Sequence, residues 1–447
     1  MPDLLEIAER IAAQAASGED VEAYVGRQRE TEVRAYEGDI ESLSVAETAG
    51  IGVRVVRDGR QGFAYVGSLS DEGATEALAE ARDNAGFATA DEHVGLVEPD
   101  GVVPPVLELW REELLSTPTE DKVALALDLE RRVRAADPRI RQVTGADYSD
   151  SISEAAIASS RGVSASSRRT VCYVGAEAVA GEGSESQNGY GYSAGRAVAD
   201  LDVGRAAGDA ALRATRLLGA HKPQSARVTV VLEPRVTASL LGIIARTLSG
   251  EEVLKGRSLF AGRTGEDVGV PGLELVDDPT NGLAFGAAAF DAEGLACRRN
   301  PLIEGGKLLG YLYDGYAARR AGTTSTASAV RAGFRSTPGV GARAVTLRPG
   351  DLDAEGVLAA VGEGLLVQGV IGIHSGVNAV SGDFSVGAEG VMIRGGELAE
   401  PVREMTIASS IQRMLQHVAH VGADVEWLPG PACGMTLAID DVALSGA

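Results

Sequence analysis

The stretch LVDDPTNGLAFGAAAFDAEGLACRRNPLIEGGKLLGYLYDGYAARRAG, residues Leu275 to Gly322, decides how the second half of the chain is interpreted. Two apolar runs, Asn300 to Glu304 and Lys307 to Asp314, flank the dipeptide Gly305-Gly306. A two-residue Gly-Gly connection predicts a β-hairpin, because both central residues of the favoured turn need positive φ. Taken alone, the stretch is typical of a surface hairpin between acidic turns.

The acidic dipeptides of this region are tempting as paired acid and base groups. They are Glu251-Glu252, Asp277-Asp278 and the pair Asp291 and Glu293. Their spacing along the chain does not bring them together, and carboxylates in turns usually stay in water. We therefore expect solvated charges at these positions unless the fold gathers them.

The composition restricts the class of protein. The chain has 447 residues, 45% of them hydrophobic but only 4% aromatic, and a formal net charge of -23. A surface this acidic repels phosphate backbones, so we expect no nucleic-acid partner. Neither a signal peptide nor an apolar run long enough to span a membrane is visible, so no membrane partner is expected. The three cysteines are sparse and lack a CxxC pair, which predicts a reducing, cytoplasmic location.

Alternating and helical patterns succeed one another along the first half. Helical spacing predicts helices at four places, and short alternating runs with turn dipeptides such as Asp58-Gly59 predict antiparallel strands between them. The expected helices cover residues 4–16, 70–84, 120–136 and 201–218. The segment His221-Lys222-Pro223 breaks the pattern, so we predict two domains, 1–222 and 223–447.

The second half is expected to be rich in β structure. A Val-dense strand over 226–232 leads through Pro234 into a helix over 235–248, and a second hairpin is predicted across Gly395-Gly396. We also expect a last helix over 405–420 and a last strand over 433–439. The whole chain is therefore predicted to be an α+β protein with mixed and antiparallel sheets.

Few residues of the chain are candidates for catalysis, metal binding or peptide binding. None of the five histidines has the spacing of a metal site, and His417 and His420 are expected to be a solvated or core-edge pair. His374 lies in a glycine-flanked loop, where functional side chains often project, although a structural loop histidine is favoured over a catalytic one. Asp383 could activate a nucleophile or cap a turn. Three arginines could line a cleft for a peptide or lie on a solvated loop: Arg331, Arg335 and Arg343.

From about Val228 to the C-terminus, the chain resembles the PmbA/TldE branch of the TldD/PmbA family. The resemblance rests on several ordered motifs. They are VVLEPRVTASLL, SGEEVLKGRSLFAGRTGEDVG, VDDP, FDAEG, LIEGGKLLGYLYDGYAARRAG, GVNAVSGDFSVGAEGVMIRGGE and PVREMTI. The first half agrees more loosely, through strand-rich runs such as the one that begins at Gly50.

The resemblance implies a metal-free subunit. TldD-type chains resemble zinc metalloproteases with His-Glu-x-x-x-His on a helix, and that motif aligns here with residues 242–247. Gly242, Ile243 and Thr247 stand in place of the two histidines and the glutamate, and none of them can hold zinc or act as a base. No complete catalytic site is therefore expected in this chain, and zinc is expected in a TldD-type partner. The pair would degrade or process unfolded or precursor peptides.

Several hypotheses follow for the individual residues. The channel that holds an extended peptide would be lined by Arg331, Arg335, His374 and Asp383. The apolar alternation of the first hairpin would form the subunit interface, together with Arg319-Arg320; its members are Leu302, Leu308, Tyr311 and Tyr313. Two alternatives stay open: a self-sufficient hydrolase that uses His374, Asp383 or Cys297, and a peptide-binding or regulatory homodimer.

Overall fold

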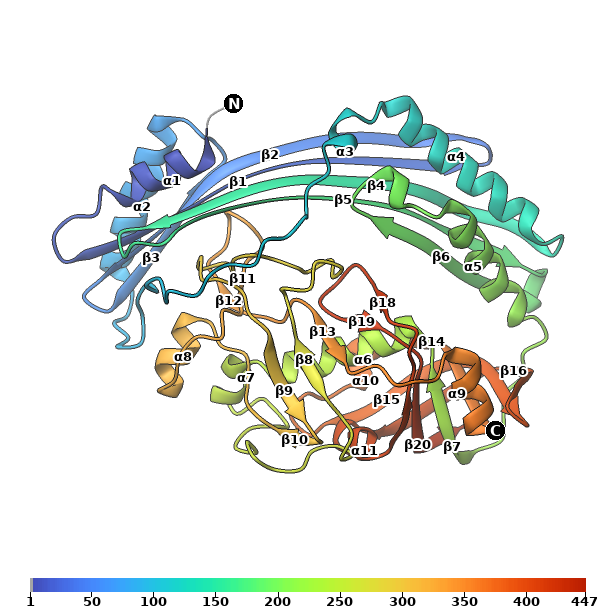
Figure 1. Cartoon of the computed structure of the whole chain (residues 1–447). Helices are drawn as coiled ribbons and strands as arrows, with labels where there is room; N and C mark the ends of the chain where they lie inside the picture. The colour runs from blue at the N-terminus through green and yellow to red at the C-terminus, as the bar shows by residue number, and fades with distance from the viewer. Residues whose placement is uncertain (1–2) are drawn as a thin grey trace.

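The computed structural model describes residues 3–447. It has two units, a long arched sheet from the first half and a β-rich unit from the second half that lies against the concave face of the arch (Figure 1). The six strands of the arch are all antiparallel, in the order β3-β2-β1-β4-β5-β6. They are β1 Glu19–Tyr36, β2 Asp39–Arg57, β3 Arg60–Val66, β4 Ile140–Ser159, β5 Ser164–Ala180 and β6 Gln187–Gly195.

Four of these strands have 17 to 20 residues, which makes each roughly 60 Å long at about 3.3 Å per residue. Helices cover the convex face only near its two ends, and each pair of helices encloses its own apolar core. One pair is α1 (Leu4–Ala12) with α2 (Asp71–Phe87), and the other is α4 (Thr119–Ala136) with α5 (Val203–Arg216); α3 (Glu112–Ser116) is a short helix between the pairs.

The second unit contains a mixed six-stranded sheet in the order β16-β15-β14-β7-β20-β17 and a four-stranded sheet in the order β10-β9-β8-β13. Within the larger sheet β14 is parallel to β7, and the other pairs are antiparallel. Its strands are β7 Ala226–Leu232, β14 Gly364–Ile371, β15 Asp383–Arg394, β16 Glu397–Ser410, β17 Val418–Val421 and β20 Leu437–Ser445. The smaller sheet has β8 Leu275–Asp277, β9 Asn300–Glu304, β10 Lys307–Leu308 and β13 Val345–Leu347.

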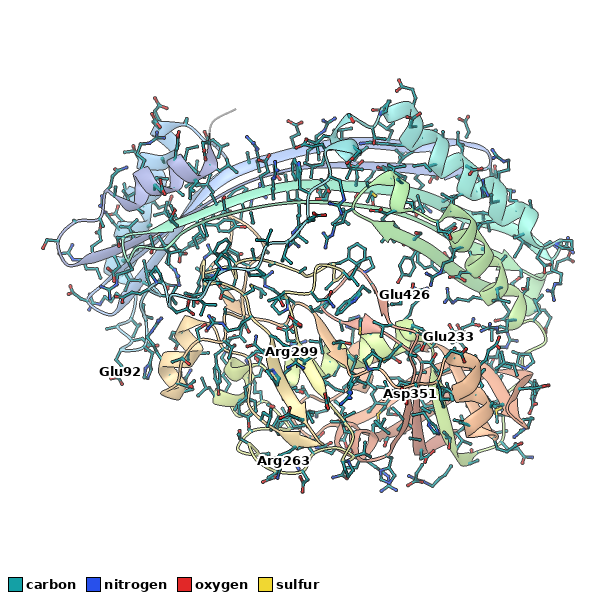
Figure 2. All side chains as sticks on the ribbon, viewed as in Figure 1. Glu92, Glu233, Arg263, Arg299, Asp351 and Glu426 are labelled. Atoms are coloured by element: carbon teal, nitrogen blue, oxygen red, sulfur yellow. The ribbon has the colours of Figure 1, made fainter. Side chains whose placement is uncertain are left out.

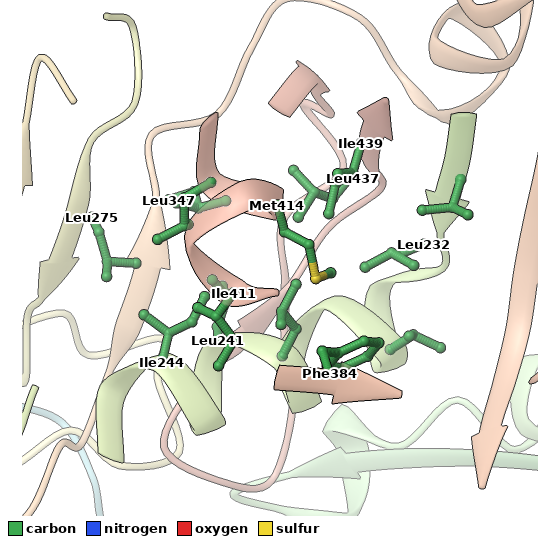
Figure 3. Close-up of a cluster of buried hydrophobic side chains, with 14 of the residues drawn as sticks. Leu232, Leu241, Ile244, Leu275, Leu347, Phe384, Ile411, Met414, Leu437 and Ile439 are labelled. Atoms are coloured by element: carbon green, nitrogen blue, oxygen red, sulfur yellow. The ribbon is translucent and has the colours of Figure 1, made fainter. Parts of the chain in front are cut away.

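The helices of this unit are short apart from α6. They are α6 Pro234–Thr247, α7 Gly250–Leu254, α8 Gly315–Ala321, α9 Ala354–Val361, α10 Ile373–Gly376 and α11 Ile411–Gln416. Two small ladders complete it: β11 Ala329–Val330 with β12 Gly339–Val340, and β18 Glu426–Trp427 with β19 Cys433–Gly434. Helix α6 begins at Pro234 and packs its apolar stripe against both sheets, where Leu241 and Ile244 join the main core (Figure 3).

The predicted α+β class with mixed and antiparallel sheets is confirmed. Both Gly-Gly hairpins form, and the glycines take the positive φ values that such turns need: 57° and 79° at Gly305 and Gly306, 59° and 84° at Gly395 and Gly396. None of the helices within residues 3–447 has the length and apolar character that a bilayer span requires.

The helix predicted over 405–420 is wrong. Residues up to Ser410 continue β16, only Ile411–Gln416 is helical, and Val418–Val421 forms β17. The apolar residues there fit a helical period, but Thr406, Ile407 and Ala408 pair with both β15 and β20. Two long-range ladders therefore override a local pattern.

The solvated charges expected in the acidic turns are also wrong for three of the side chains. Asp277, Asp291 and Glu293 are each less than 5% exposed. Asp277 accepts hydrogen bonds from the backbone N–H groups of Arg343 and Ala344, so the fold satisfies its carboxylate with peptide dipoles rather than with water. Burial raises its pKa even so.

The first hairpin is a core element. Leu302, Leu308 and Leu312 are almost fully buried, and Tyr311 donates its hydroxyl to the carbonyl of Phe260 over 2.6 Å. Arg319 donates to the carbonyls of His93 and Gly95 in the first half of the chain. Leu302, Leu308 and Arg319 are therefore used within the chain, and a subunit interface at this hairpin stays a prediction.

Candidate functional site

The candidate site is a cavity of about 700 Å³ between the arched sheet and helix α6. Its wall on the sheet side comes from β5 and β6, and the other wall from α6, β14, β15 and the loop after β18. The side chains that could contact a ligand are mainly aromatic or charged: Tyr173, Tyr190, Tyr192, Arg213, Arg235 and Glu389.

Strand β6 places its tyrosines by simple alternation. Gly189 and Gly191 face α5 so closely that a Cβ atom on Gly191 would lie 2.0 Å from the carbonyl oxygen of Ala206. Successive side chains of a strand point to opposite faces, so Tyr190 and Tyr192 point toward the cavity. The ring of Tyr192 stacks on that of Tyr173, with centroids 5.6 Å apart, and Tyr173 and Tyr190 share a hydroxyl contact. Burial raises the pKa of Tyr192 to about 12.

Arg235, in the first turn of α6, reaches across the cavity to these rings. Its guanidinium carbon lies 5.0 Å from the ring centroid of Tyr190 and 5.1 Å from that of Tyr192, which is cation–π geometry. Nη1 donates to the carbonyl of Tyr190 over 3.2 Å. Burial, with the repulsion of nearby Arg213, lowers the pKa of Arg235.

The neighbouring arginines are neutralised by acids. Glu233 accepts from Arg216 over 2.7 Å and from Arg213 over 3.4 Å, and Asp209 lies 3.6 Å from Arg213. Glu233 and Glu426 both lie where the arched sheet meets the second unit, and Glu426 binds Arg205 of α5 over 2.7 Å (Figure 2). These ion pairs connect α5 to the second unit beside the cavity.

Helix α6 carries the three positions where the resemblance places a metal motif. Gly242 lines the cavity, and a Cβ atom there would meet nothing within 4 Å. Ile243 packs against the main core, while Thr247 is buried and donates its hydroxyl to the carbonyl of Ile244 over 2.7 Å. Gly242 has no side chain, Ile243 offers only hydrocarbon, and the hydroxyl of Thr247 is already hydrogen-bonded. These three positions therefore do not fit a zinc ion. Within residues 3–447, no three His, Cys, Asp or Glu side chains lie close enough together to hold a metal.

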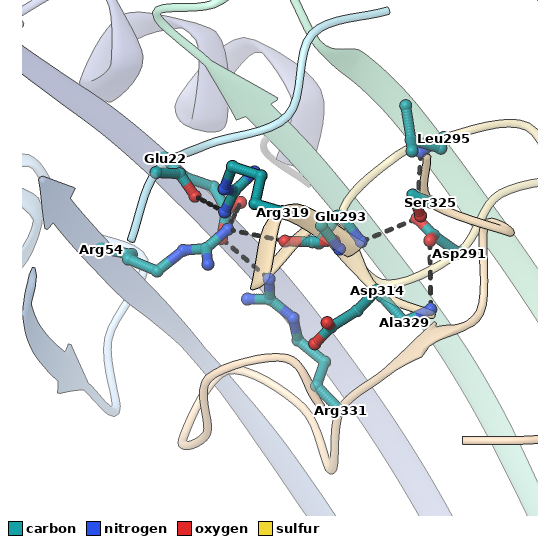
Figure 4. Close-up of polar contacts among 12 residues, drawn as sticks. Glu22, Arg54, Asp291, Glu293, Leu295, Asp314, Arg319, Ser325, Ala329 and Arg331 are labelled. Carbon is teal, nitrogen blue, oxygen red and sulfur yellow. Dashed lines mark hydrogen bonds and ion pairs between the residues drawn. The ribbon is translucent and has the colours of Figure 1, made fainter. Parts of the chain in front are cut away.

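A second cavity, of about 710 Å³, opens over a buried ionic cluster that includes Arg54 and Glu293. Figure 4 shows the side chains of this cluster. Glu22 of β1 accepts from Arg54 over 2.5 Å and from Arg331 over 2.8 Å. Burial alone would raise the pKa of Glu22, but these two guanidinium groups hold it below its ordinary value. Glu293 accepts the N–H of Gly315 over 2.7 Å, and burial raises its pKa to about 7 despite Arg54.

The structure does not bring the four predicted channel residues together. Arg331 belongs to the buried ionic cluster, with a side chain that is 2% exposed. Arg335 is exposed and stacks on Phe334, at 5.2 Å from its ring centroid. His374 is exposed on α10, next to Ile373 of the cavity wall, and Asp383 is exposed at the start of β15, where it accepts the hydroxyl of Ser381.

Sequence reasoning missed the groups that do line the cavity: Tyr190, Tyr192, Arg235 and Glu389. A local signal existed in the alternation Gly189-Tyr190-Gly191-Tyr192, which predicts a strand with one small face and one aromatic face. Nothing in the sequence indicated that Arg235, 45 positions after Tyr190, would contact it.

Comparison with known proteins places the chain in a class of proteins related to metallopeptidases. Three family models match successive parts of the chain: the PmbA/TldA metallopeptidase domain 1 over residues 21–85, the central domain over 112–218 and the C-terminal domain over 225–446. The chain belongs to the PmbA/TldD family.

Individual relatives extend over almost the whole chain. The Metalloprotease PmbA of Escherichia coli O157:H7 is 26% identical over 97% of this chain and 94% of its own length. A metalloprotease of Methanothermobacter thermautotrophicus is 27% identical over 89% and 87%. The crystal structure of TldE from Thermococcus kodakarensis superposes with a TM-score of 0.89 at 24% identity, covering 99% of this chain and 100% of its own, which shows the shared fold.

Proposed function

We propose that this chain is the metal-free subunit of a zinc-dependent peptidase, and that a TldD-type partner supplies the zinc and the catalytic base. The observation that carries the proposal is Gly242, which lines the cavity at the place where the resemblance aligns the first histidine of the motif. The position faces a cavity but offers no ligand atom. This arrangement suits a chain that keeps a peptide-sized space and leaves the chemistry to another subunit.

The cavity has the properties that an extended peptide would need. Tyrosine rings on one wall can pack against side chains of varied size, and polar groups on α6, β14 and β15 can bond peptide N–H and carbonyl groups. A volume of about 700 Å³ accommodates a few residues of an extended chain. The substrates we propose are therefore unfolded or precursor peptides. The three cysteines are free and buried, which suits a cytoplasmic setting.

The alternative of a self-sufficient hydrolase has little support. Cys297 is buried and its pKa is raised to about 12, so its thiol stays protonated near neutral pH. Among residues 3–447, no hydrogen bond or ion pair connects His374 to Asp383. A homodimer that only binds peptides would need the same cavity. Reconstitution with a TldD-type relative distinguishes it from our proposal, because such a homodimer would not support cleavage.

The test is reconstitution. The purified chain, its TldD-type relative from the same genome and an equimolar mixture are each assayed for bound zinc by mass spectrometry and for cleavage of a fluorogenic unfolded peptide. We expect zinc with the relative and cleavage only in the mixture. A relative whose motif glutamate is changed to glutamine serves as the inactive control. Stoichiometric zinc together with cleavage in this chain alone would overturn the proposal.

A further inference from the structure

We propose that the cavity beneath β6 binds the carboxylate of a peptide, and that Arg235 is the group that receives it. The inference rests on the proposed function for the nature of the ligand as a peptide. The carboxylate chemistry rests on the cavity alone. The expected source of the carboxylate is the free C-terminus of the chain that is held.

Arg235 is a half-buried cation without an acidic partner among the described residues. Within the part of the chain that the structure describes, no carboxylate oxygen lies within 4.0 Å of its guanidinium, whereas Arg213 and Arg216 each have such a partner. Its contacts are the faces of Tyr190 and Tyr192 and one backbone carbonyl. A guanidinium has five N–H donors, so most of the donors of Arg235 remain available to a ligand.

The surroundings favour an anion at this point. Arg213 lies close enough to repel Arg235, and Glu233, the acid that attracts Arg235, is already bound to Arg213 and Arg216. A bound carboxylate would relieve the repulsion and form charge-assisted hydrogen bonds at a half-buried guanidinium. The tyrosine faces hold the guanidinium in place, so little side-chain entropy remains to be lost on binding.

The rest of the cavity fits the remainder of a peptide. Glu389, on β15, is half-buried, and desolvation alone raises its pKa. Its carboxyl can accept backbone N–H groups, and it discourages a second anion. The space in front of Gly242 is open to a side chain, because a Cβ atom there meets nothing within 4 Å. The carboxylate end of the ligand would therefore be fixed by Arg235, and the space in front of Gly242 would accept side chains of different sizes.

The test compares three fluorescein-labelled hexapeptides of alternating alanine and leucine by fluorescence anisotropy, with the intact chain in the absence of any partner. One has a free C-terminal carboxylate, one a C-terminal amide, and one an amide with a glutamate at the fifth position. We expect the free acid to bind about ten-fold to a hundred-fold more tightly than the plain amide. Tight binding of the third peptide instead would support the site and assign the carboxylate to a side chain.

Matched variants identify the arginine. Arg235→Met should abolish the preference for the acid, whereas Arg246→Met should keep it, because Arg246 is exposed on the same helix. Arg235→Lys retains the charge without the planar stack, so it should keep a reduced preference; it also serves if the methionine variant fails to fold by circular dichroism. Equal binding of acid and amide by the wild type, or a full preference in Arg235→Met, would overturn the proposal.

The outcome is separable from the test of the proposed function. A preference for the acid with no zinc-dependent cleavage in the reconstituted mixture would retain the carboxylate site and remove the role as a peptidase subunit. Cleavage in the mixture, with no preference for the acid in the single chain, would retain the role as a peptidase subunit and remove the carboxylate site.

Discussion

Nη2 of Arg54, on strand β2 of the arched sheet, lies 3.5 Å from Oε1 of Glu293 in the second unit, and both side chains are at most 5% exposed. The two residues are 239 positions apart in the chain. Their contact, with Glu22 and Arg331 beside it, places a buried set of charges across the interface between the units (Figure 4). Four predictions test this interface and the cavity at its other end.

The first prediction concerns the pH dependence of stability. The pKa of Glu293 is raised from 4.5 to about 7 in the folded chain, so the folded state holds a proton that the unfolded state has lost between these pH values. The wild type should therefore lose stability as the pH rises from about 4.5 to 7, and Glu293→Gln should lack this contribution. The free energy of unfolding of the variant, relative to that of the wild type, should therefore rise by up to roughly 3 kcal/mol between pH 4.5 and 8. Urea unfolding at several pH values measures it, and a constant difference would contradict it.

A second prediction concerns Glu22, which neutralises both Arg54 and Arg331. Glu22→Gln leaves two buried guanidinium groups without their principal acid, and the loss of one partner of a buried ion pair typically costs about 3–5 kcal/mol. The midpoint of urea unfolding should fall accordingly. Asp71→Asn is the control, because its pair with Arg10 is exposed and should contribute less than about 1 kcal/mol. Similar effects of the two variants would count against the cluster as a major stabilising element.

A third prediction concerns the close contact between Gly191 and helix α5, which orients Tyr190 and Tyr192 toward the cavity. Gly191→Ala places a methyl group 2.0 Å from the carbonyl oxygen of Ala206, so α5 or β6 must move. Overpacking of this kind typically costs about 1–3 kcal/mol, and peptide binding in the cavity should weaken as Tyr190 and Tyr192 shift. Gly208→Ala is the control: it lies in α5 with nothing within 4 Å of a Cβ atom and should be neutral or slightly stabilising. Thermal unfolding and anisotropy separate the two effects.

A fourth prediction concerns the positions that align with the metal motif. Gly242→Ala adds a methyl group in open space within a helix, which should stabilise the chain by about 0.5–1 kcal/mol. Thr247→His should destabilise it by about 1–3 kcal/mol, since that side chain is 1% exposed in the core. Differential scanning calorimetry measures both changes. A Thr247→His variant as stable as wild type would show that the end of α6 can accommodate a ligand-sized side chain.

Local features of this chain could be predicted because their causes are local. The turns at Gly305-Gly306 and Gly395-Gly396 need positive φ, which glycine adopts at little cost, and Pro234 starts α6 where its missing N–H is not needed. Between residues 405 and 420 the local pattern misled, because pairing with β15 and β20 outweighed helical spacing.

The sequence by itself determined the α+β class, the two Gly-Gly hairpins, membership of the family and the absence of ligand atoms at Gly242 and Ile243. Only the tertiary structure decided which charges are buried and which residues form a site. Glu293 and Arg331 meet Arg54 and Glu22 there, and Arg235 meets Tyr190 across two units. The physical reason is that burial and ion pairing depend on distances through space, whereas periodicity reports only on neighbours along the chain.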